Sequence, residues 1–180
     1  MIKPRPEPGR GVQSALAYHH STGNPIHRGL RAIAGSKPGA WFFSKTIQPM
    51  DGAVLTATKG RTTLSELLAG LPVLNVTTTG RTSGEPRTAP LIAVPIGDDL
   101  ALLGTNFGGQ RTPAWVYNLE ANPNAVAEYR TVEVPVVARP ATDEEYEQVF
   151  AAGGSIYGGY TKYRSRADHR DIRVFILERA

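Results

Sequence analysis

A series of short segments rich in Val, Leu, Ile and Thr begins at Leu71, and turn residues separate each segment from the next. Such residues are enriched in strands, so the pattern predicts strands at 71–79, 88–95, 100–105, 125–129, 132–138 and 172–177. Gly97-Asp98-Asp99 is a tight-turn sequence, and we expect the first three strands to form an antiparallel meander. Pro90 and Pro95 cannot donate to a ladder, so the second strand must bulge or run along an edge.

Helices are expected between the strands and near the N-terminus. Thr112 is expected to cap a helix over 114–121, and the capping box at 142–145 opens another that Gly153-Gly154 ends. Short helices are expected at 12–18 and from Pro25. The run at 172–177 is apolar at almost every position, as in a strand covered on both faces. This order predicts a β-rich α+β fold, a small barrel of about six antiparallel strands with covering helices.

Composition limits the domain organisation and the chemistry. A chain of 180 residues suits one domain with an extension, which we expect as a basic, Pro/Gly-rich segment 1–60 followed by a barrel domain 61–180. The absence of cysteine excludes disulfides and thiolate chemistry. No apolar run approaches the ~18 residues of a membrane span, and we expect a cytoplasmic protein.

The charge is unevenly distributed along the chain. Residues 1–50 carry seven Lys or Arg and one acid, whereas the remainder is slightly negative. A basic segment that also holds Trp41, Phe42 and Phe43 can rest on an anionic membrane surface, which would place the protein at the inner face of the membrane. A nucleic-acid surface and simple solubility are the other interpretations of this charge.

The loop at 80–87 is the leading candidate for a binding site. Gly80 and Gly84 can adopt positive φ and let backbone N–H groups converge on an anion, while Arg81 and Arg87 add two guanidinium groups. Gly108-Gly109 before the helix at 114–121 is a second anion-binding arrangement, and both loops can open on one end of the same sheet. An ordinary solvated turn remains the alternative for each loop.

Hydrolytic machinery, a metal site and a dinucleotide fingerprint are not indicated by the sequence, whereas the two loops suit a redox cofactor. The chain has no nucleophile elbow, its four histidines show no catalytic or metal-binding spacing, and no dinucleotide fingerprint joins a strand to a helix. The two loops suit a flat ligand with an anionic tail, and Trp115 can face its ring or lie in the core. Tyr157, Tyr160 and Tyr163 are spaced by three, so they can line a pocket under a Gly-rich lid or pack an amphipathic helix onto the barrel.

Together these motifs resemble the deazaflavin-dependent nitroreductase and quinone reductase family. The resemblance rests on TTTGRTSGEPRTAPL at 77–91, NFG at 106–108, PAW at 113–115, NL at 118–119, ANP at 121–123 and YGGYTKY at 157–163, and it covers about residue 38 to the C-terminus. It implies a split β-barrel of the flavin-mononucleotide-binding type that uses coenzyme F420. The implied reaction is hydride transfer from the reduced cofactor to a quinone, nitroaromatic or activated enone.

The resemblance also assigns roles to individual residues. The implied cofactor contacts are Arg81, Thr82, Ser83, Arg87, Thr88, Ala89, Pro90, Leu91, Ile92, Gly104, Thr105, Asn106, Phe107, Ala114, Trp115, Val116, Tyr117 and Asn118. Tyr160 is the expected proton donor to the developing oxyanion, and Tyr157 and Tyr163 are expected to bind the acceptor. Some members carry Lys where this chain has Thr82 and Phe107, so tail binding is expected to shift to Arg87, Arg111 or the segment 59–61.

Alternatives from other classes remain at this stage. The same barrel can bind flavin mononucleotide and act as an ordinary flavin oxidoreductase. A non-catalytic basic protein that binds membrane or nucleic acid predicts steeply salt-dependent binding and no cofactor affinity. For the enzyme we expect a small-molecule acceptor, no nucleic acid and no metal, with peripheral membrane contact through 1–50 and a homodimer left open.

Overall fold

The fold is a curled antiparallel sheet with helices on its outside, seen in a computed structural model that describes residues 11–19, 72–106, 109–156, 160 and 171–180. The sheet contains β1 (Leu74–Thr79), β2 (Pro86–Leu91), β3 (Val94–Ile96), β4 (Asp99–Leu103), β5 (Asn124–Tyr129), β6 (Val132–Pro140) and β7 (Val174–Arg179). The helices are α1 (Val12–Leu16), α5 (Ala114–Ala121) and α6 (Asp143–Ile156). The expected β-rich α+β split barrel is confirmed, with seven strands in place of about six.

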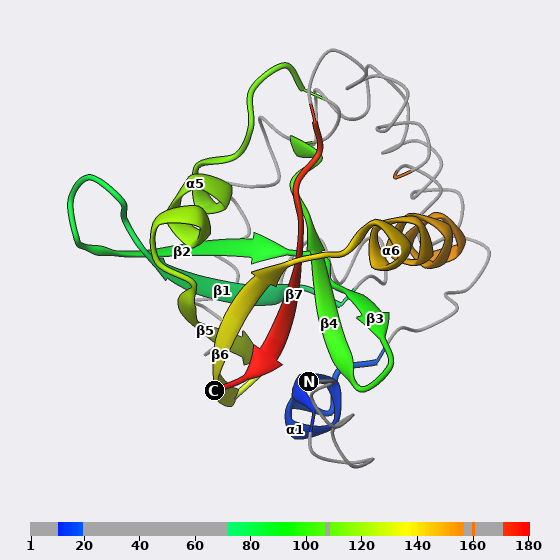
Figure 1. Cartoon of the computed structure of the whole chain (residues 1–180). Helices are drawn as coiled ribbons and strands as arrows, with labels where there is room; N and C mark the ends of the chain where they lie inside the picture. The colour runs from blue at the N-terminus through cyan, green and yellow to red at the C-terminus, as the bar shows by residue number, and fades with distance from the viewer. Residues whose placement is uncertain (1–10, 20–71, 107–108, 157–159, 161–170) are drawn as a thin grey trace, which may run out of the picture.

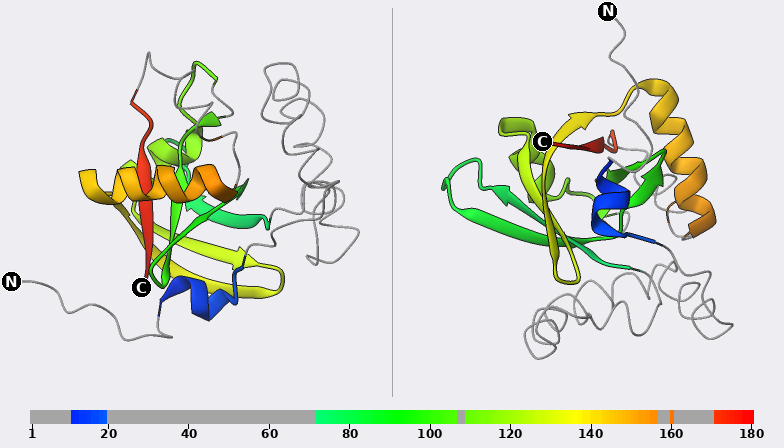
Figure 2. Two further views of the ribbon diagram at one scale, coloured as in Figure 1. Left: turned by 90° about the vertical axis from the view of Figure 1, so that its right-hand side faces the viewer. Right: turned by 90° about the horizontal axis from the view of Figure 1, so that it is seen from below.

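The two strands at the edges of the sheet are consecutive in the sequence. The strand order is β2-β1-β5-β6-β7-β4-β3, and only Ile92 and Ala93 lie between β2 and β3. Three Cα–Cα steps of ~3.8 Å hold the end of β2 within roughly 11 Å of the start of β3. The sheet must therefore curl until its edges meet, and the curl is visible in Figure 1 and in both views of Figure 2.

This arrangement confirms one prediction from the prolines and corrects another. Pro90 lies in β2 and Pro95 in β3, and both strands are edges, as their missing N–H groups require. The expected meander is wrong, because the segment at 88–95 is two strands that belong to opposite edges. β2 pairs only with β1, and β3 pairs only with β4, among the residues that the structure describes.

Apolar side chains fill both faces of the strands at the centre of this curl. Along β7, Phe175 and Leu177 belong to one core cluster, and Val174 and Ile176 belong to a second. The prediction of a strand covered on both faces is confirmed, since these alternating side chains are all buried. The first cluster fills the barrel beneath α1 and α5, whereas the second lies under α6.

The helices agree with the sequence except at three ends, the first of which is α1, since it ends at Leu16 and not at 18. α5 has the expected bounds, but Pro113 is its N-cap residue in place of Thr112, because its ψ of 147° is extended and not helical. α6 continues through Gly153-Gly154 to Ile156. Gly153 serves packing and does not end the helix, since an added Cβ would lie 3.0 Å from the Tyr160 ring. The helix expected from Pro25 lies outside the described residues.

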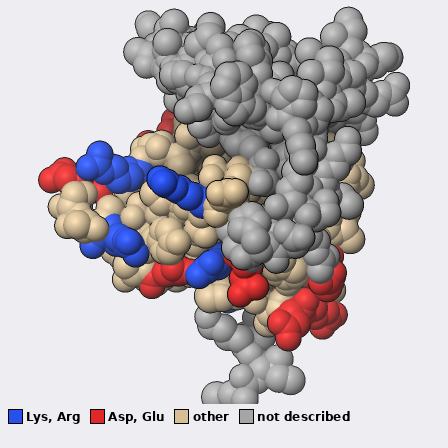
Figure 3. Space-filling view, turned by 90° about the horizontal axis from the view of Figure 1, so that it is seen from above, with Lys and Arg blue, Asp and Glu red and all other residues tan. Residues whose placement is uncertain are grey.

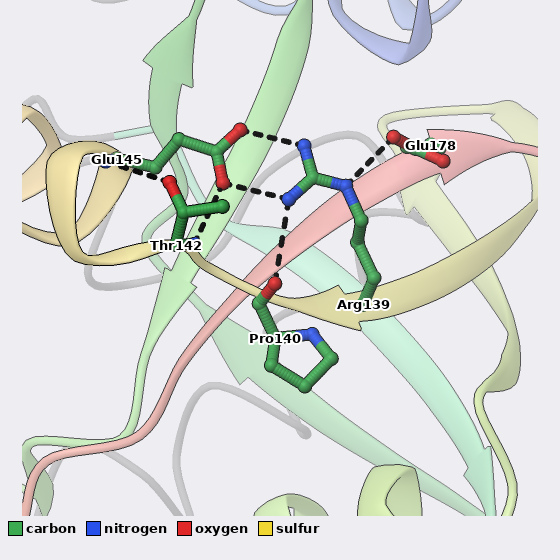
Figure 4. A network of polar contacts seen from close by, with 5 residues as sticks. All are labelled: Arg139, Pro140, Thr142, Glu145 and Glu178. Atoms are coloured by element: carbon green, nitrogen blue, oxygen red, sulfur yellow. Dashed lines mark hydrogen bonds and ion pairs between the residues drawn. The ribbon is translucent and has the colours of Figure 1, made fainter. Parts of the chain in front are cut away.

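A bidentate ion pair fixes the start of α6 to the sheet (Figure 4). Glu145 accepts two hydrogen bonds of 2.6 Å from Arg139 of β6, whose Nε donates to Glu178 of β7 at 2.8 Å. The expected capping box is confirmed, because Thr142 Oγ1 accepts the Glu145 N–H at 3.3 Å and Glu145 accepts the Thr142 N–H at 2.9 Å. The hydrogen bonds from Arg139 lower the pKa of Glu145 from 4.5 to about 2.

We predict that Glu145→Ala destabilises the fold by about 1–2 kcal/mol at neutral pH, because it removes a cap and a partly exposed ion pair. Glu145 has a lowered pKa when folded, so its contribution is present above pH 4.5 and is lost as the pH falls toward 2. Denaturant melts of wild type and variant should therefore converge over that window. Glu144→Ala, on the same turn and exposed, is the matched control, and an equal loss in both variants would contradict the assignment.

Candidate cofactor site

The β1–β2 hairpin loop has a fixed backbone that depends on its glycines for two different reasons. Gly84 has φ +71°, as expected for a glycine turn, and its N–H donates to the Gly80 carbonyl at 2.7 Å. Gly80 is not among the positive-φ residues, so that part of the expectation is wrong. An added Cβ at Gly80 would lie 3.1 Å from the Glu85 carbonyl oxygen, and the loop needs glycine there for close approach.

The loop presents cations and a smaller set of N–H groups than expected. The N–H groups of Gly80, Gly84 and Arg81 donate to acceptors within the protein. Among the described contacts, the N–H groups of Thr82 and Ser83 have no acceptor and can donate to a ligand. Arg81, Thr82, Ser83 and Arg87 are all exposed. Figure 3 shows basic side chains gathered on the side from which this hairpin projects, with an acidic side chain among them. An anion can therefore meet two guanidinium groups and two N–H donors here.

Helix α5 holds the loop in place through two neighbouring residues. The Arg81 guanidinium lies over the Tyr117 ring, 4.7 Å from its centroid. Asn118, which is 6 % exposed, accepts the Arg81 N–H at 3.1 Å and donates to Thr78 Oγ1 at 3.0 Å. Asn118 therefore joins helix, strand and loop, a role that the sequence pattern did not show.

The second candidate loop leaves the same end of the sheet as the hairpin. β1 and β4 are four places apart in a fully antiparallel order, so they run in the same direction, and the predicted common end is confirmed. Asn106 adopts φ 47°, and its side chain donates to the Arg111 carbonyl at 2.8 Å. Gly104 and Thr105 are buried, and Phe107 lies outside the described residues.

The predicted contacts on β2 and α5 differ in their accessibility. Thr88 and Pro90 are exposed on the edge strand, and Ala89, Leu91 and Ile92 are partly exposed. On α5, Ala114 is exposed and Tyr117 is half-buried, whereas Val116 is buried. Trp115 is 7 % exposed and packs edge-on against Phe175, with ring centroids 6.2 Å apart. Of the two interpretations of Trp115, the core position is the one that the structure shows.

Tyr160 lies against the joint between β2 and β3, which consists of Ile92 and Ala93. It is 5 % exposed, its ring packs on Gly153, and its hydroxyl donates to the Ile92 carbonyl at 3.0 Å. Ile92 is the last residue of the predicted cofactor stretch. Tyr157 and Tyr163 lie outside the described residues.

Comparison with known proteins places this geometry in a family. Residues 51–179 match the family model described as F420H(2)-dependent quinone reductase. An F420H(2)-dependent quinone reductase of Mycobacterium tuberculosis strain H37Rv is 30 % identical over 131 residues, which cover 71 % of this chain and 86 % of that protein. The chain therefore belongs to the F420H(2)-dependent quinone reductase family, and the resemblance stated from the motifs is confirmed.

Two solved structures share the fold with similar sequence identity. One, described as an F420-H2 dependent reductase, FDR-A, is 32 % identical with a TM-score of 0.55 and covers 59 % of this chain and 94 % of that one. Another, described as a domain-swapped dimer, is 29 % identical with a TM-score of 0.57 and covers 79 % of this chain and 100 % of that one. These similarities support the family assignment.

We predict that Asn118→Ala destabilises the protein by about 1–3 kcal/mol, because it removes the buried amide that accepts the Arg81 N–H and donates to Thr78 Oγ1. Amide exchange should accelerate at the hairpin loop more than in β6. Asn124→Ala removes an exposed amide from the first residue of β5 and should change stability by less than about 0.5 kcal/mol. Equal effects of the two substitutions would show that Asn118 does not organise the loop.

Proposed function

We propose that this chain catalyses hydride transfer from reduced coenzyme F420 to a quinone, and that it also accepts nitroaromatics and activated enones. The observation that carries the proposal is the family match over residues 51–179, which contains every residue assigned to the site. The reduced deazaflavin supplies the hydride. The protein's contribution is to bind, orient and exclude water.

The hairpin loop fits the anionic tail of such a cofactor. Arg81 and Arg87 are exposed, Arg81 is oriented by Tyr117, and the Thr82 and Ser83 N–H groups stand between them in the chain. β2, with its exposed Thr88 and Pro90, leads from this loop to the joint beside Tyr160. A cofactor bound along β2 would then have its anionic tail at the cationic loop and its flat ring toward Tyr160. Arg111, also exposed, can add charge from the second loop.

Tyr160 is our proposed proton donor to the oxyanion that forms on the acceptor. Its hydroxyl hydrogen is directed at the Ile92 carbonyl, so donation requires a shift of that hydrogen from a peptide oxygen to the acceptor oxygen. Ile92 is partly exposed, and water can replace the bond that its carbonyl gives up. Tyr157 and Tyr163 are proposed to border the acceptor.

Cellular placement and assembly are proposed separately. Within the described residues, no helix combines the length and apolar character needed to cross a membrane. We propose a cytoplasmic enzyme that contacts the inner membrane face through its basic residues 1–50, where a quinone would be reached. A homodimer is proposed because a structure with 29 % identity is described as a domain-swapped dimer.

Titration with oxidised F420 tests the proposed function. We predict quenching of tryptophan fluorescence at micromolar cofactor, weaker binding of flavin mononucleotide, and turnover of reduced F420 with menadione as acceptor. Arg81→Gln should weaken F420 affinity about tenfold, since one charge-assisted contact is lost. Arg130→Gln is the matched control, because Arg130 also stacks on a tyrosine but lies at the β5–β6 turn. Absence of F420 binding by the wild-type protein would contradict the proposed function.

Tyr160→Phe should lower turnover with menadione by at least about tenfold and leave F420 affinity within about twofold, since a general acid acts on the reaction and not on tail binding. Single-turnover oxidation of bound, reduced F420 measures the chemical step directly. Unchanged single-turnover rates would remove Tyr160 from the mechanism.

A further inference from the structure

Ala93, in the two-residue link between β2 and β3, lies outside the strand pairings of the described residues, and its backbone is held by a side chain. Ile92 and Ala93 fall between the two edge strands, at the point where the chain passes from one edge of the sheet to the other. Ala93 is 0 % exposed, so water cannot satisfy its N–H and carbonyl groups. A buried peptide group without a hydrogen bond costs about 1–3 kcal/mol, so this joint needs partners from elsewhere in the chain.

One hydroxyl from the N-terminal segment contacts both backbone groups of Ala93. Tyr18 Oη accepts the Ala93 N–H at 3.1 Å, and it lies 3.2 Å from the Ala93 carbonyl and 3.0 Å from the Pro72 carbonyl. The single hydroxyl hydrogen is shared between those two carbonyls. Tyr18 thus connects the joint to the residue that leads into β1, the strand that pairs with β2. Tyr160 holds the adjacent Ile92 carbonyl.

Helix α1 fixes Tyr18 in this position. Val12 and Leu16 are buried in the barrel core, and the Tyr18 ring packs edge-on against Tyr129 with centroids 4.9 Å apart. The β3–β4 turn holds the start of the helix, because Asp98 accepts the Gly11 N–H at 2.7 Å and the Gln13 N–H at 2.9 Å. Figure 1 shows α1 beside this turn. Tyr18 is 2 % exposed and belongs to the core cluster that fills the barrel.

We infer that Tyr18 is a positioning residue of the cofactor site, acting through the backbone of Ala93 on the strand that precedes it. This inference rests on the proposed function, in which residues 87–92 contact F420. Tyr18 and α1 precede the stretch at 51–179 that matches the family model. A segment outside the matched region therefore sets the geometry of the site within it.

Loss of the Tyr18 hydroxyl is expected to make the end of β2 less ordered and to leave the hydride-transfer step unchanged. Without the hydroxyl, the buried Ala93 N–H loses the acceptor that Tyr18 provides, so the end of β2 is held less firmly. Within the part of the chain that the structure describes, β2 is an edge strand with one neighbour, so a single ladder resists motion of that end. Cofactor binding must then order the strand as well as contact it, which weakens affinity.

Tyr18→Phe is the informative variant, because it keeps the ring against Tyr129 and removes only the hydroxyl. We expect exchange of the Ala93 amide, measured by NMR without cofactor, to accelerate at least about tenfold. We also expect F420 affinity to fall about tenfold while the single-turnover rate of bound, reduced F420 changes by less than about twofold. Val134→Ala, a buried truncation in β6, is the control for general destabilisation, and it should leave both the Ala93 amide and F420 affinity near wild type.

The outcomes separate this inference from the proposed function. If wild type does not bind F420, the proposed function fails, whatever Tyr18→Phe does to exchange at Ala93. If wild type binds F420 and Tyr18→Phe binds it equally well, the positioning role is wrong. A Val134→Ala variant that loses as much affinity as Tyr18→Phe would also overturn it, since stability alone would then explain the loss. Unchanged exchange at Ala93 would contradict the structural basis.

Discussion

The two-residue joint between β2 and β3 is the constraint on which the rest of the structure depends. Seven strands in a row present two edges, and a link of Ile92 and Ala93 can connect those edges only if the sheet curls upon itself. The curl creates an interior, which the side chains of α1, α5 and the central strands fill. It also creates buried backbone at Ala93, whose N–H donates to Tyr18, while the carbonyl of the partly exposed Ile92 accepts from Tyr160.

The candidate site extends from this joint along β2 to the hairpin loop. At the far end, Asn118 and Tyr117 fix the loop so that Arg81 is oriented before any ligand arrives. At the near end, Tyr160 and Tyr18 fix the backbone of Ile92 and Ala93. An edge strand that pairs with a single neighbour among the described residues is well suited to ligand contact, and anchors at both ends reduce the ordering cost of binding. The F420H(2)-dependent quinone reductase family assignment gives this strand its proposed ligand.

Local pattern in the sequence predicted most of the elements, whereas contacts between distant residues decided the rest. Strand composition located the segments of the sheet, and the capping box at Thr142 and Glu145 located the start of α6. Pro90 and Pro95 correctly indicated edge strands, but two edges at opposite ends of one sheet depend on pairings far apart in the chain. Gly153 resembled a helix end because its packing against Tyr160 is a tertiary contact. Tyr18 carried no signal at all, since an isolated tyrosine in a basic extension has no informative spacing.

Amide hydrogen exchange of the chain, with and without oxidised F420, measures whether the cofactor binds along β2. We expect saturating cofactor to protect amides in two stretches, the loop at 81–83 and the strand at 87–92, with Ala93 protected before cofactor is added. Pro90 has no amide hydrogen, so exchange in β2 is measured at the residues on either side of it. Protection confined to other strands, or saturable binding that leaves both stretches unchanged, would contradict a cofactor site built on β2 and its joint.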